Sequence, residues 1–267
     1  MSGLGRFLEF SVRSTDILDS LSFYKALGFR ELTSGDMWPH RYAVVSDGLL
    51  CIGLHERDFD SPAVTFVQQD LAKHARGMSD HGFLFTEMKL DEDVFNEISL
   101  KDHDGHLVTM VEARTFNFDE EDDDDSACGT FFEVTLPVRN ATRAARFWGS
   151  VTHVLEELRE DPTIHMRFDA GGISLGISES IALQQPSLCF KGPDLDALAA
   201  IIERHGLKHD KFPGFEGARC VLTAPEGTQL YVFDEDFLGG AIEVEESEDT
   251  SSFPAYAVPN KGDDKGD

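Results

Sequence analysis

Glu9 and His55 are the candidates for acid–base chemistry near the start of the chain. Alternate residues in Leu8–Val12 are apolar and are expected to share one face of a strand, so Glu9 points to the other face. If that face is enclosed, desolvation raises the pKa of the Glu9 carboxyl toward the range of a general base, and His55 could orient it or titrate with it. The alternative is structural, with Glu9 held by Ser11, His55 or Arg13.

The segment Gly35–Arg41 contains Trp38, His40 and Arg41 and has no counterpart in the second half of the chain. A loop of this composition could close over a site beside Glu9. Trp38 would then stack on a ligand, and Arg41 would meet an anionic group. Ordinary packing of Trp38 at the rim of the fold is the alternative.

The chain contains two copies of one pattern, displaced by 124 positions. Phe7-Leu-Glu-Phe-Ser-Val12 returns as Phe131-Phe-Glu-Val-Thr-Leu136, so Glu9 corresponds to Glu133. Within each copy a related unit starts 54 residues further on, at Ala63 and at Ser187. Because a repeat at fixed spacing determines the architecture, the sequence predicts four related units in two halves.

Each unit is predicted to consist of one strand, one helix and three further strands. Ser46-Asp47-Gly48 favours a hairpin turn between the strands Tyr42–Val45 and Leu49–Leu54, because glycine adopts positive φ angles without strain. The residue before each helix is of a type that accepts hydrogen bonds at an N-cap. These residues are Asp16, Asp70, Asn140 and Asp194.

Four such units resemble the vicinal oxygen chelate (VOC) superfamily of glyoxalases, bleomycin resistance proteins and extradiol dioxygenases. The resemblance covers roughly 7–113 and 131–237. It rests on Leu21-Ser-Phe-Tyr-Lys-Ala-Leu-Gly-Phe29, similar to S-L-x-F-Y-x-x-L-G-F, and on the turns Asp102-His-Asp-Gly105 and Ala224-Pro-Glu-Gly227, similar to D-P-D-G. It implies an α+β fold in which four βαβββ modules pair into two half-open β-cups with helices on the convex faces. In the family the concave face usually holds a divalent metal and the substrate.

The ligand positions implied by the resemblance are only partly filled here by residue types that bind divalent metals. A carboxylate is retained at the first strand of each half, with His55 as a substitute ligand in the first half only. We therefore expect no metal and no cofactor, with a divalent metal at Glu9 and His55 as the alternative. At the first strand the two halves have Glu9 and Glu133, at the fifth strand Ala63 and Ser187, and at the last strand Thr109 and Tyr231.

Strand alternation within such cups predicts further inward side chains, including Phe7 and Phe131. A mainly apolar cavity with a few polar groups is the usual form of a small-molecule site. The candidate catalytic residues are Glu9 and His55. The candidate ligand-binding residues are Trp38, His40, Arg41, Thr109, Glu133, Lys191 and Tyr231.

Composition limits the partners. The chain has 267 residues, of which 23 are basic and 50 acidic, and its net charge of −27 repels nucleic acids and anionic membranes. No apolar run approaches the ~18 residues of a membrane span, and the start lacks a signal-peptide pattern, so we expect a cytoplasmic protein. Blocks of acidic residues predict a linker at 117–129 and a mostly disordered tail at 239–267, which flank domains at 1–116 and 130–238.

Three functions are consistent with these observations. The first is binding of a small amphipathic or aromatic molecule, mainly in the first cup. The second is a lyase, isomerase or dioxygenase that uses Glu9 as a base or as a metal ligand. The third is a noncatalytic interaction protein whose cups are filled by side chains. A homodimer is compatible with all three.

Overall fold

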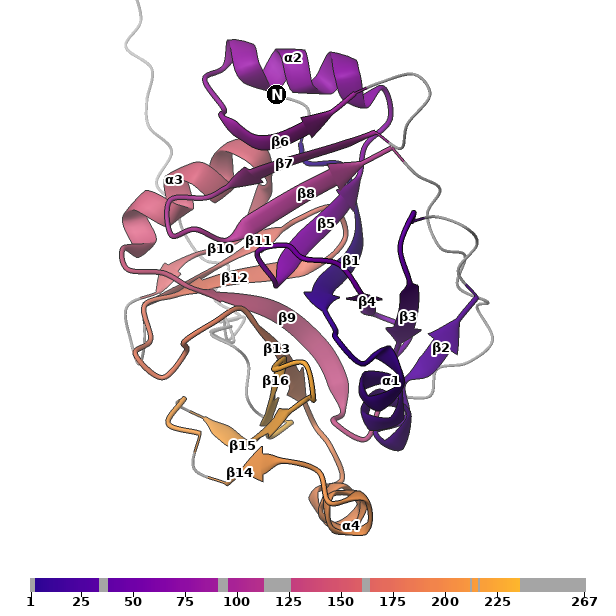
Figure 1. The fold of residues 1–267 in the computed structure, drawn as a ribbon. Coiled ribbons are helices and arrows are strands. Elements are labelled where there is room, and N and C mark those ends of the chain that lie inside the picture. The colour runs from indigo at the N-terminus through magenta and orange to yellow at the C-terminus, as the bar shows by residue number, and fades with distance from the viewer. Residues whose placement is uncertain are drawn as a thin grey trace, which may run out of the picture.

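The computed structural model describes residues 3–33, 38–90, 96–112, 126–159, 164–211, 213–215 and 217–235. These residues form two eight-stranded mixed sheets, one from each half of the chain (Figure 1). The elements of the first half are β1 (Arg6–Arg13), α1 (Ile17–Ala26), β2 (Arg30–Leu32), β3 (Tyr42–Ser46), β4 (Cys51–His55), β5 (Ala63–Val67), α2 (Leu71–Asp80), β6 (Phe85–Lys89), β7 (Glu97–Lys101) and β8 (Leu107–Val111). Those of the second half are β9 (Thr130–Pro137), α3 (Ala141–Val151), β10 (His153–Arg159), β11 (His165–Asp169), β12 (Ser174–Ser178), β13 (Ser187–Lys191), α4 (Leu195–His205), β14 (His209–Asp210), β15 (Ala218–Thr223) and β16 (Gln229–Phe233).

The order of strands is the same in both sheets, and it confirms the predicted βαβββ modules. The first sheet has the order β2-β3-β4-β1-β5-β8-β7-β6, and the second has β10-β11-β12-β9-β13-β16-β15-β14. β1 and β5 are antiparallel at the centre, and each runs parallel to the last strand of its own module. Each cup is therefore built from two modules of one half.

Local sequence explains where three of the four helices begin. Asp16, Asn140 and Asp194 accept hydrogen bonds from backbone N–H groups in the first turns of α1, α3 and α4, as their residue types predict. Asp70 differs, because it adopts a left-handed φ of 50° and its side chain makes no capping bond to α2. Its own N–H donates to the Glu112 carboxylate instead.

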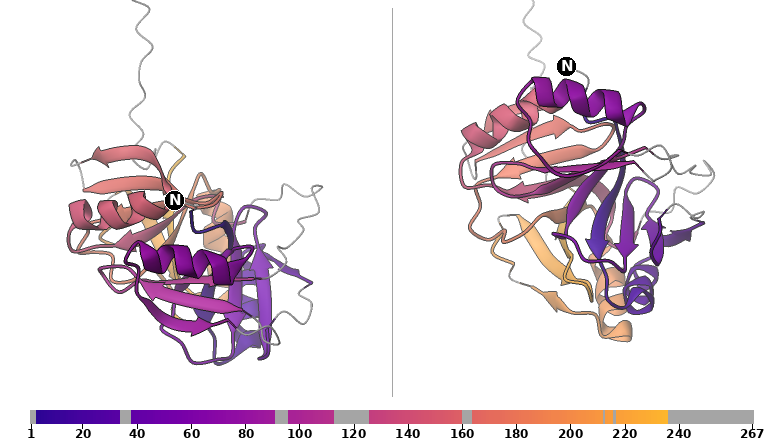
Figure 2. Two further views of the ribbon diagram at one scale, coloured as in Figure 1. Left: turned by 90° about the horizontal axis from the view of Figure 1, so that it is seen from above. Right: turned by 45° about the horizontal axis from the view of Figure 1, so that its top comes forward.

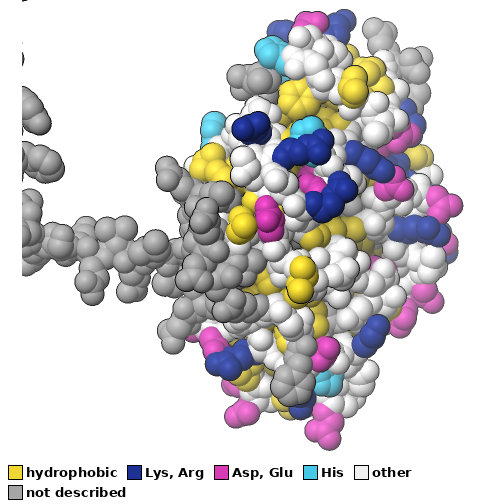
Figure 3. All heavy atoms as spheres, turned by 90° about the vertical axis from the view of Figure 1, so that its left-hand side faces the viewer, with side chains coloured by type: hydrophobic (Ala, Val, Ile, Leu, Met, Phe, Trp, Pro, Cys, Tyr) yellow, Lys and Arg dark blue, Asp and Glu magenta, His cyan; other side chains and the backbone are white. Residues whose placement is uncertain are grey.

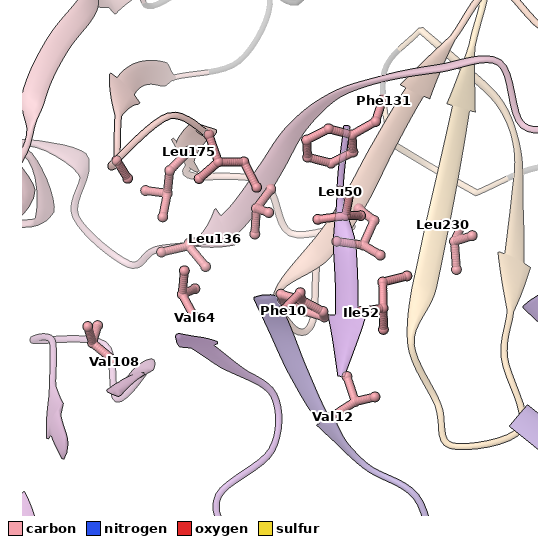
Figure 4. Close-up of a cluster of buried hydrophobic side chains, with 14 of the residues drawn as sticks. Phe10, Val12, Leu50, Ile52, Val64, Val108, Phe131, Leu136, Leu175 and Leu230 are labelled. Atoms are coloured by element: carbon pink, nitrogen blue, oxygen red, sulfur yellow. The ribbon is translucent and has the colours of Figure 1, made fainter. Parts of the chain in front are cut away.

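The largest hydrophobic core contains side chains of both halves. Figure 4 shows Phe10, Val12 and Ile52 of the first sheet beside Phe131 and Leu230 of the second. Figures 1 and 2 show α2 and α3 at one end of the molecule and α1 and α4 at the other. The apolar faces of both sheets are thus covered by helices and by each other, which leaves the opposite faces for a site.

A β-bulge changes which residues face this core. The register of β1 with β5 shifts between Phe7 and Glu9, so Phe7 packs against Phe66 in the core and Leu8 packs with Trp38 on the other face. The expectations that Leu8 faces the helices and Phe7 lines the cup are therefore wrong. The same shift occurs in β9, where Phe131 joins the core and its neighbour packs on the cup side.

Two polar contacts that are related by the repeat join the halves. The Tyr24 hydroxyl donates to Glu226 over 2.6 Å, and the Trp148 indole donates to Asp102 over 3.2 Å. Both donors lie 124 positions apart, as do both acceptors, so the interface follows the internal symmetry. Each turn that resembles D-P-D-G therefore binds the first helix of the other half.

Most of the predicted acidic linker and all of the predicted tail lie outside the described residues. The end of the linker is packed, since Ser126 and Cys128 are buried and the Ala127 N–H donates to the Leu27 carbonyl. Acidic and basic side chains are interspersed on the face seen in Figure 3. None of the helices in the described ranges has the length and apolar character that crossing a bilayer requires.

Candidate functional site

The cup face of the first sheet has a carboxylate at its centre. Glu9 lies on β1, between β4 and β5, and is fully buried. On β4, a Cβ atom added to Gly53 would stand 2.3 Å from Glu9 Cδ. Glycine at this position therefore provides the space that the carboxylate occupies, which no larger residue would leave free.

Three side chains bind the Glu9 carboxylate. Ser11 donates to Oε1 over 2.7 Å, His55 Nε2 lies 2.6 Å from the same oxygen, and the Tyr42 hydroxyl donates to Oε2. Burial raises the pKa of the Glu9 carboxyl, but the charge of His55 and the three hydrogen bonds lower it more, so the pKa lies below its ordinary value. The expected rise toward the range of a general base is wrong, because Glu9 is paired.

A second histidine extends this arrangement toward the rim. His40 Nε2 lies 2.8 Å from His55 Nδ1, so a carboxylate and two imidazoles form one hydrogen-bonded row. Burial, together with the charges of His55 and Arg57, lowers the pKa of His40 to about 4. His40 is therefore neutral at pH 7, and it can donate with one ring nitrogen while it accepts with the other.

Trp38 packs against this row. The Trp38 ring is buried and packs edge-on against the His55 ring, with 4.9 Å between the two ring centres. Arg41 does not join the site, because its guanidinium is exposed and pairs with Glu56 at 3.3 Å. Thr109 is buried on β8, where its hydroxyl lies 3.1 Å from that of Ser99.

The cavity between these side chains is small. Its volume is about 10 Å³, which is about the smallest space that holds one water molecule. A larger ligand therefore requires the covering side chains to move. The lining residues are Ser11, Trp38, His55, Arg57, Phe59, Ala63, Thr65 and Thr109.

Arg57 belongs to the site although its sequence context gave no prediction of it. Its guanidinium donates to both oxygens of Glu97 on β7, at 3.2 and 2.5 Å, and its Cζ lies 5.4 Å from the centre of the Trp38 ring and 5.6 Å from that of Phe59. Burial lowers the pKa of Arg57, but Glu97 raises it above its ordinary value. The available signal was its spacing, two residues beyond His55.

The second cup repeats the central carboxylate with other partners. Glu133 is buried, accepts from Thr135 and lies 3.0 Å from His165 Nε2 and 3.1 Å from Arg167 Nε. By strand register His165 takes the place of Tyr42, and Ser178 that of His55. Glu133 therefore contacts one imidazole, that of His165, whereas Glu9 begins a row that contains two.

Aromatic side chains pack together near Cys189, the residue in register with Glu133. The Phe215 ring packs edge-on against the rings of Tyr231 and Phe233, with 5.4 and 5.7 Å between the ring centres. Lys191 is half-buried at the end of β13, opposite Phe233. Of the predicted second-cup residues, Tyr231 thus belongs to an apolar cluster, while Glu133 belongs to a polar one.

Comparisons with known proteins establish the fold. No family model and no curated protein matches the sequence. Among solved structures, the 2,3-dioxygenase LapB from Pseudomonas sp. KL28 has 15% identity and a TM-score of 0.58, with 88% of this chain and 93% of that chain covered. A catechol 2,3-dioxygenase has 13% identity, a TM-score of 0.57, and coverage of 88% and 89%. The Mn(II)-bound glyoxalase from Novosphingobium aromaticivorans has 12% identity, a TM-score of 0.56, and coverage of 88% and 83%.

These similarities contradict the expectation that no metal is involved, since one of the similar proteins is a Mn(II)-bound glyoxalase. The first cup nevertheless does not fit a three-ligand metal centre as it stands. Within the described ranges, no three His, Cys, Asp or Glu side chains converge. The residues in register with Glu9 on β5 and β8 are Thr65 and Thr109, and the Glu9 oxygens are already bound by protein donors.

The shared topology and the coverage of both halves account for the repeat found in the sequence. Two modules pair within each half, and the turn and helix segments that carried the resemblance form the interface between the halves. The chain therefore has the two-domain fold of the vicinal oxygen chelate superfamily.

Proposed function

We propose that the chain binds a small aromatic or amphipathic molecule in the first cup, beside Glu9 and His55. The hydrogen-bonded row of Glu9, His55 and His40 is the observation that carries this proposal. Burying a carboxylate and an imidazole costs free energy that an apolar filling would avoid. Polar groups kept beside a cavity that aromatic side chains border are the usual features of a small-molecule site.

The second cup supports the proposal by contrast. There, Phe215 packs onto Tyr231 and Phe233, and this apolar cluster lies beside a polar cluster in which Glu133 contacts only one imidazole, that of His165. The first cup has instead Trp38 and Phe59 at its border and hydroxyl and imidazole groups within. Binding is therefore assigned to the first half, and the second half serves as its structural partner.

Entry of a ligand requires Trp38 and His40 to move, because the closed cavity holds little more than one water molecule. The contacts to be broken include the hydrogen bond between His40 and His55 and the contacts of the Trp38 ring with His55 and Arg57. Trp38 also packs with Leu8 and Val111, so its displacement exposes apolar surface that the ligand must cover. A ligand with an aromatic ring would replace the Trp38 contact with His55.

Tryptophan fluorescence provides the test, because the chain has two tryptophans and Trp148 is buried at the interface between the halves. Titration with benzoate, benzamide and phenol should change the emission of Trp38 saturably, and Trp38→Phe should remove the change. Glu9→Gln should weaken binding, whereas Glu133→Gln, the matched change in the second cup, should not. Equal effects of both variants, or no saturable change with any probe, would refute the proposal. Elemental analysis of the same samples reports the metal content.

Proton transfer is a second candidate function, and the orientation of His55 favours it. Glu9 holds His55 Nε2, so the atom available to accept a proton is His55 Nδ1, which His40 connects to the rim. This is the arrangement of a carboxylate that orients an imidazole base. A substrate with an acidic C–H bond beside a carbonyl would lose that proton to His55 once His40 has moved.

Deuterium exchange tests this second function. The protein in D₂O should exchange the C–H protons of dihydroxyacetone faster than buffer does, as measured by NMR, and His55→Gln should abolish the difference. His165→Gln, which removes the imidazole bound to Glu133 in the second cup, is the control and should retain the exchange. Exchange that persists in His55→Gln would exclude His55 as the base.

A further inference from the structure

We infer that Arg57 selects an anionic oxygen, such as a carboxylate, on the molecule that the first cup binds. The inference rests on the proposed binding function and adds the chemical class of the ligand. It starts from the residues that line the cavity, which include one guanidinium, one imidazole and three hydroxyl groups. Neither Glu9 nor Glu97 is among them.

The imidazole and the guanidinium of the lining are each bound by a buried carboxylate. Glu9 binds His55 at 2.6 Å, and Glu97 binds two nitrogens of Arg57. Both carboxylates are buried, at 0% and 2% exposure. Their oxygens bind these partners, so the two carboxylates fix the imidazole and the guanidinium in place.

The Arg57 guanidinium also contacts two aromatic rings, and its contact with Phe59 does not depend on Trp38, which moves when a ligand enters. Its Cζ lies 5.4 Å from the centre of the Trp38 ring and 5.6 Å from that of Phe59, distances at which a cation is attracted to an aromatic face. A guanidinium has five N–H donors, and two nitrogens donate to Glu97. The remaining donors are available to a second planar acceptor, which is the geometry a carboxylate offers.

The free donors of Arg57, and not a local excess of positive charge, favour an anionic ligand. Lys89 approaches Glu97 at 3.6 Å and also pairs with Glu87, so its charge is balanced within this cluster. A neutral ligand would leave the free donors of Arg57 without an acceptor once water is excluded. An ammonium group would be repelled by the guanidinium.

Benzoate, benzamide and benzylamine test the inference, because the ring is constant and only the charged group changes. Ligand-observed NMR should show benzoate bound about tenfold or more tighter than benzamide, with benzylamine weakest. Arg57→Gln alone would leave Glu97 buried and unpaired, so the double variant Arg57→Gln/Glu97→Gln is the informative one. It should lose the preference for benzoate while its affinity for benzamide stays within about twofold.

Each outcome has a defined meaning. The role of Arg57 is refuted if the native protein binds benzamide as tightly as benzoate, or if the double variant still prefers benzoate. Either result leaves the binding function intact. Tighter binding of benzylamine assigns the cup to cations and overturns the inference. Absence of binding by all three probes refutes both the inference and the proposed function for aromatic ligands. Arg57→Lys, which keeps the charge but loses the fork, should give an intermediate preference.

Discussion

Gly53→Ala is the substitution that tests the central arrangement with the smallest change. The added methyl group would stand 2.3 Å from Glu9 Cδ and 2.4 Å from both carboxylate oxygens. Ordinary van der Waals contact begins near 3.4 Å. Gly53 does not have a positive φ, so the effect comes from this contact and not from backbone strain.

The magnitude follows from the bonds that the carboxylate would lose. A displacement of about 1 Å lengthens the contacts of Glu9 with His55 and Ser11, now 2.6 and 2.7 Å, beyond hydrogen-bonding distance. A buried charge that loses its partners costs about 3–5 kcal/mol. We expect a decrease of this size in the free energy of unfolding, together with loss of binding in the first cup.

Urea denaturation followed by circular dichroism measures the effect. Gly176→Ala is the matched variant, because its methyl group would stand 2.1 Å from Glu133 Oε1, and it should destabilise the protein similarly without affecting binding. Gly77→Ala on α2 meets nothing within 4 Å and should stabilise the protein by about 0.5–1 kcal/mol. In the Glu9→Ala background, Gly53→Ala should cost less than about 1 kcal/mol. A cost that is unchanged by Glu9→Ala would show that Glu9 does not occupy the space at Gly53.

Three further predictions concern the rest of the molecule. Tyr24→Phe should lower the free energy of unfolding by about 1–3 kcal/mol, because Glu226 loses a buried donor between the halves; an unchanged urea midpoint would contradict this. Burial raises the pKa of Glu97, but Arg57 and Lys89 lower it more, so the pKa is lower in the folded protein than in the unfolded chain. The contribution of the Glu97 carboxylate to the free energy of unfolding is therefore complete above the unfolded pKa of 4.5, and it is lost as the pH falls through the lower folded pKa. The stability difference between the native protein and Glu97→Gln should therefore shrink below pH 4.5, as measured by urea denaturation across pH; a constant difference would contradict the ion pair. Burial also raises the pKa of all four thiols, so native protein at pH 8 should resist iodoacetamide while unfolded protein is alkylated four times, as counted by mass spectrometry. Rapid alkylation of the native protein would show that the cysteines are accessible.

The fold could be predicted because its determinants are local and repeated. Helix caps such as Asp16 and Asn140 act within three residues, and the turn at Gly48 depends on one φ angle. Repetition at 124 positions predicted the same module in both halves, whereas the pairing of two modules within each half is a finding of the structure.

The parts that the sequence did not reveal depend on contacts between distant residues. The bulge that exchanges Phe7 and Leu8 cannot be read from alternation, because a bulge breaks the period of two without a characteristic residue. Whether the pKa of Glu9 rises or falls depends on His55, which is 46 positions away in the chain. Arg57 becomes significant only through Glu97, 40 positions further along the chain.

A crystal structure of the protein with benzoate tests the central claim most directly. We predict electron density for benzoate in the first cup, with its carboxylate within hydrogen-bonding distance of Arg57. Trp38 and His40 should be displaced from His55, and the cluster of Phe215 and Tyr231 in the second cup should be unchanged. Benzoate bound elsewhere, or a first cup that remains closed at saturating concentration, would contradict the assignment of the first cup as the binding site.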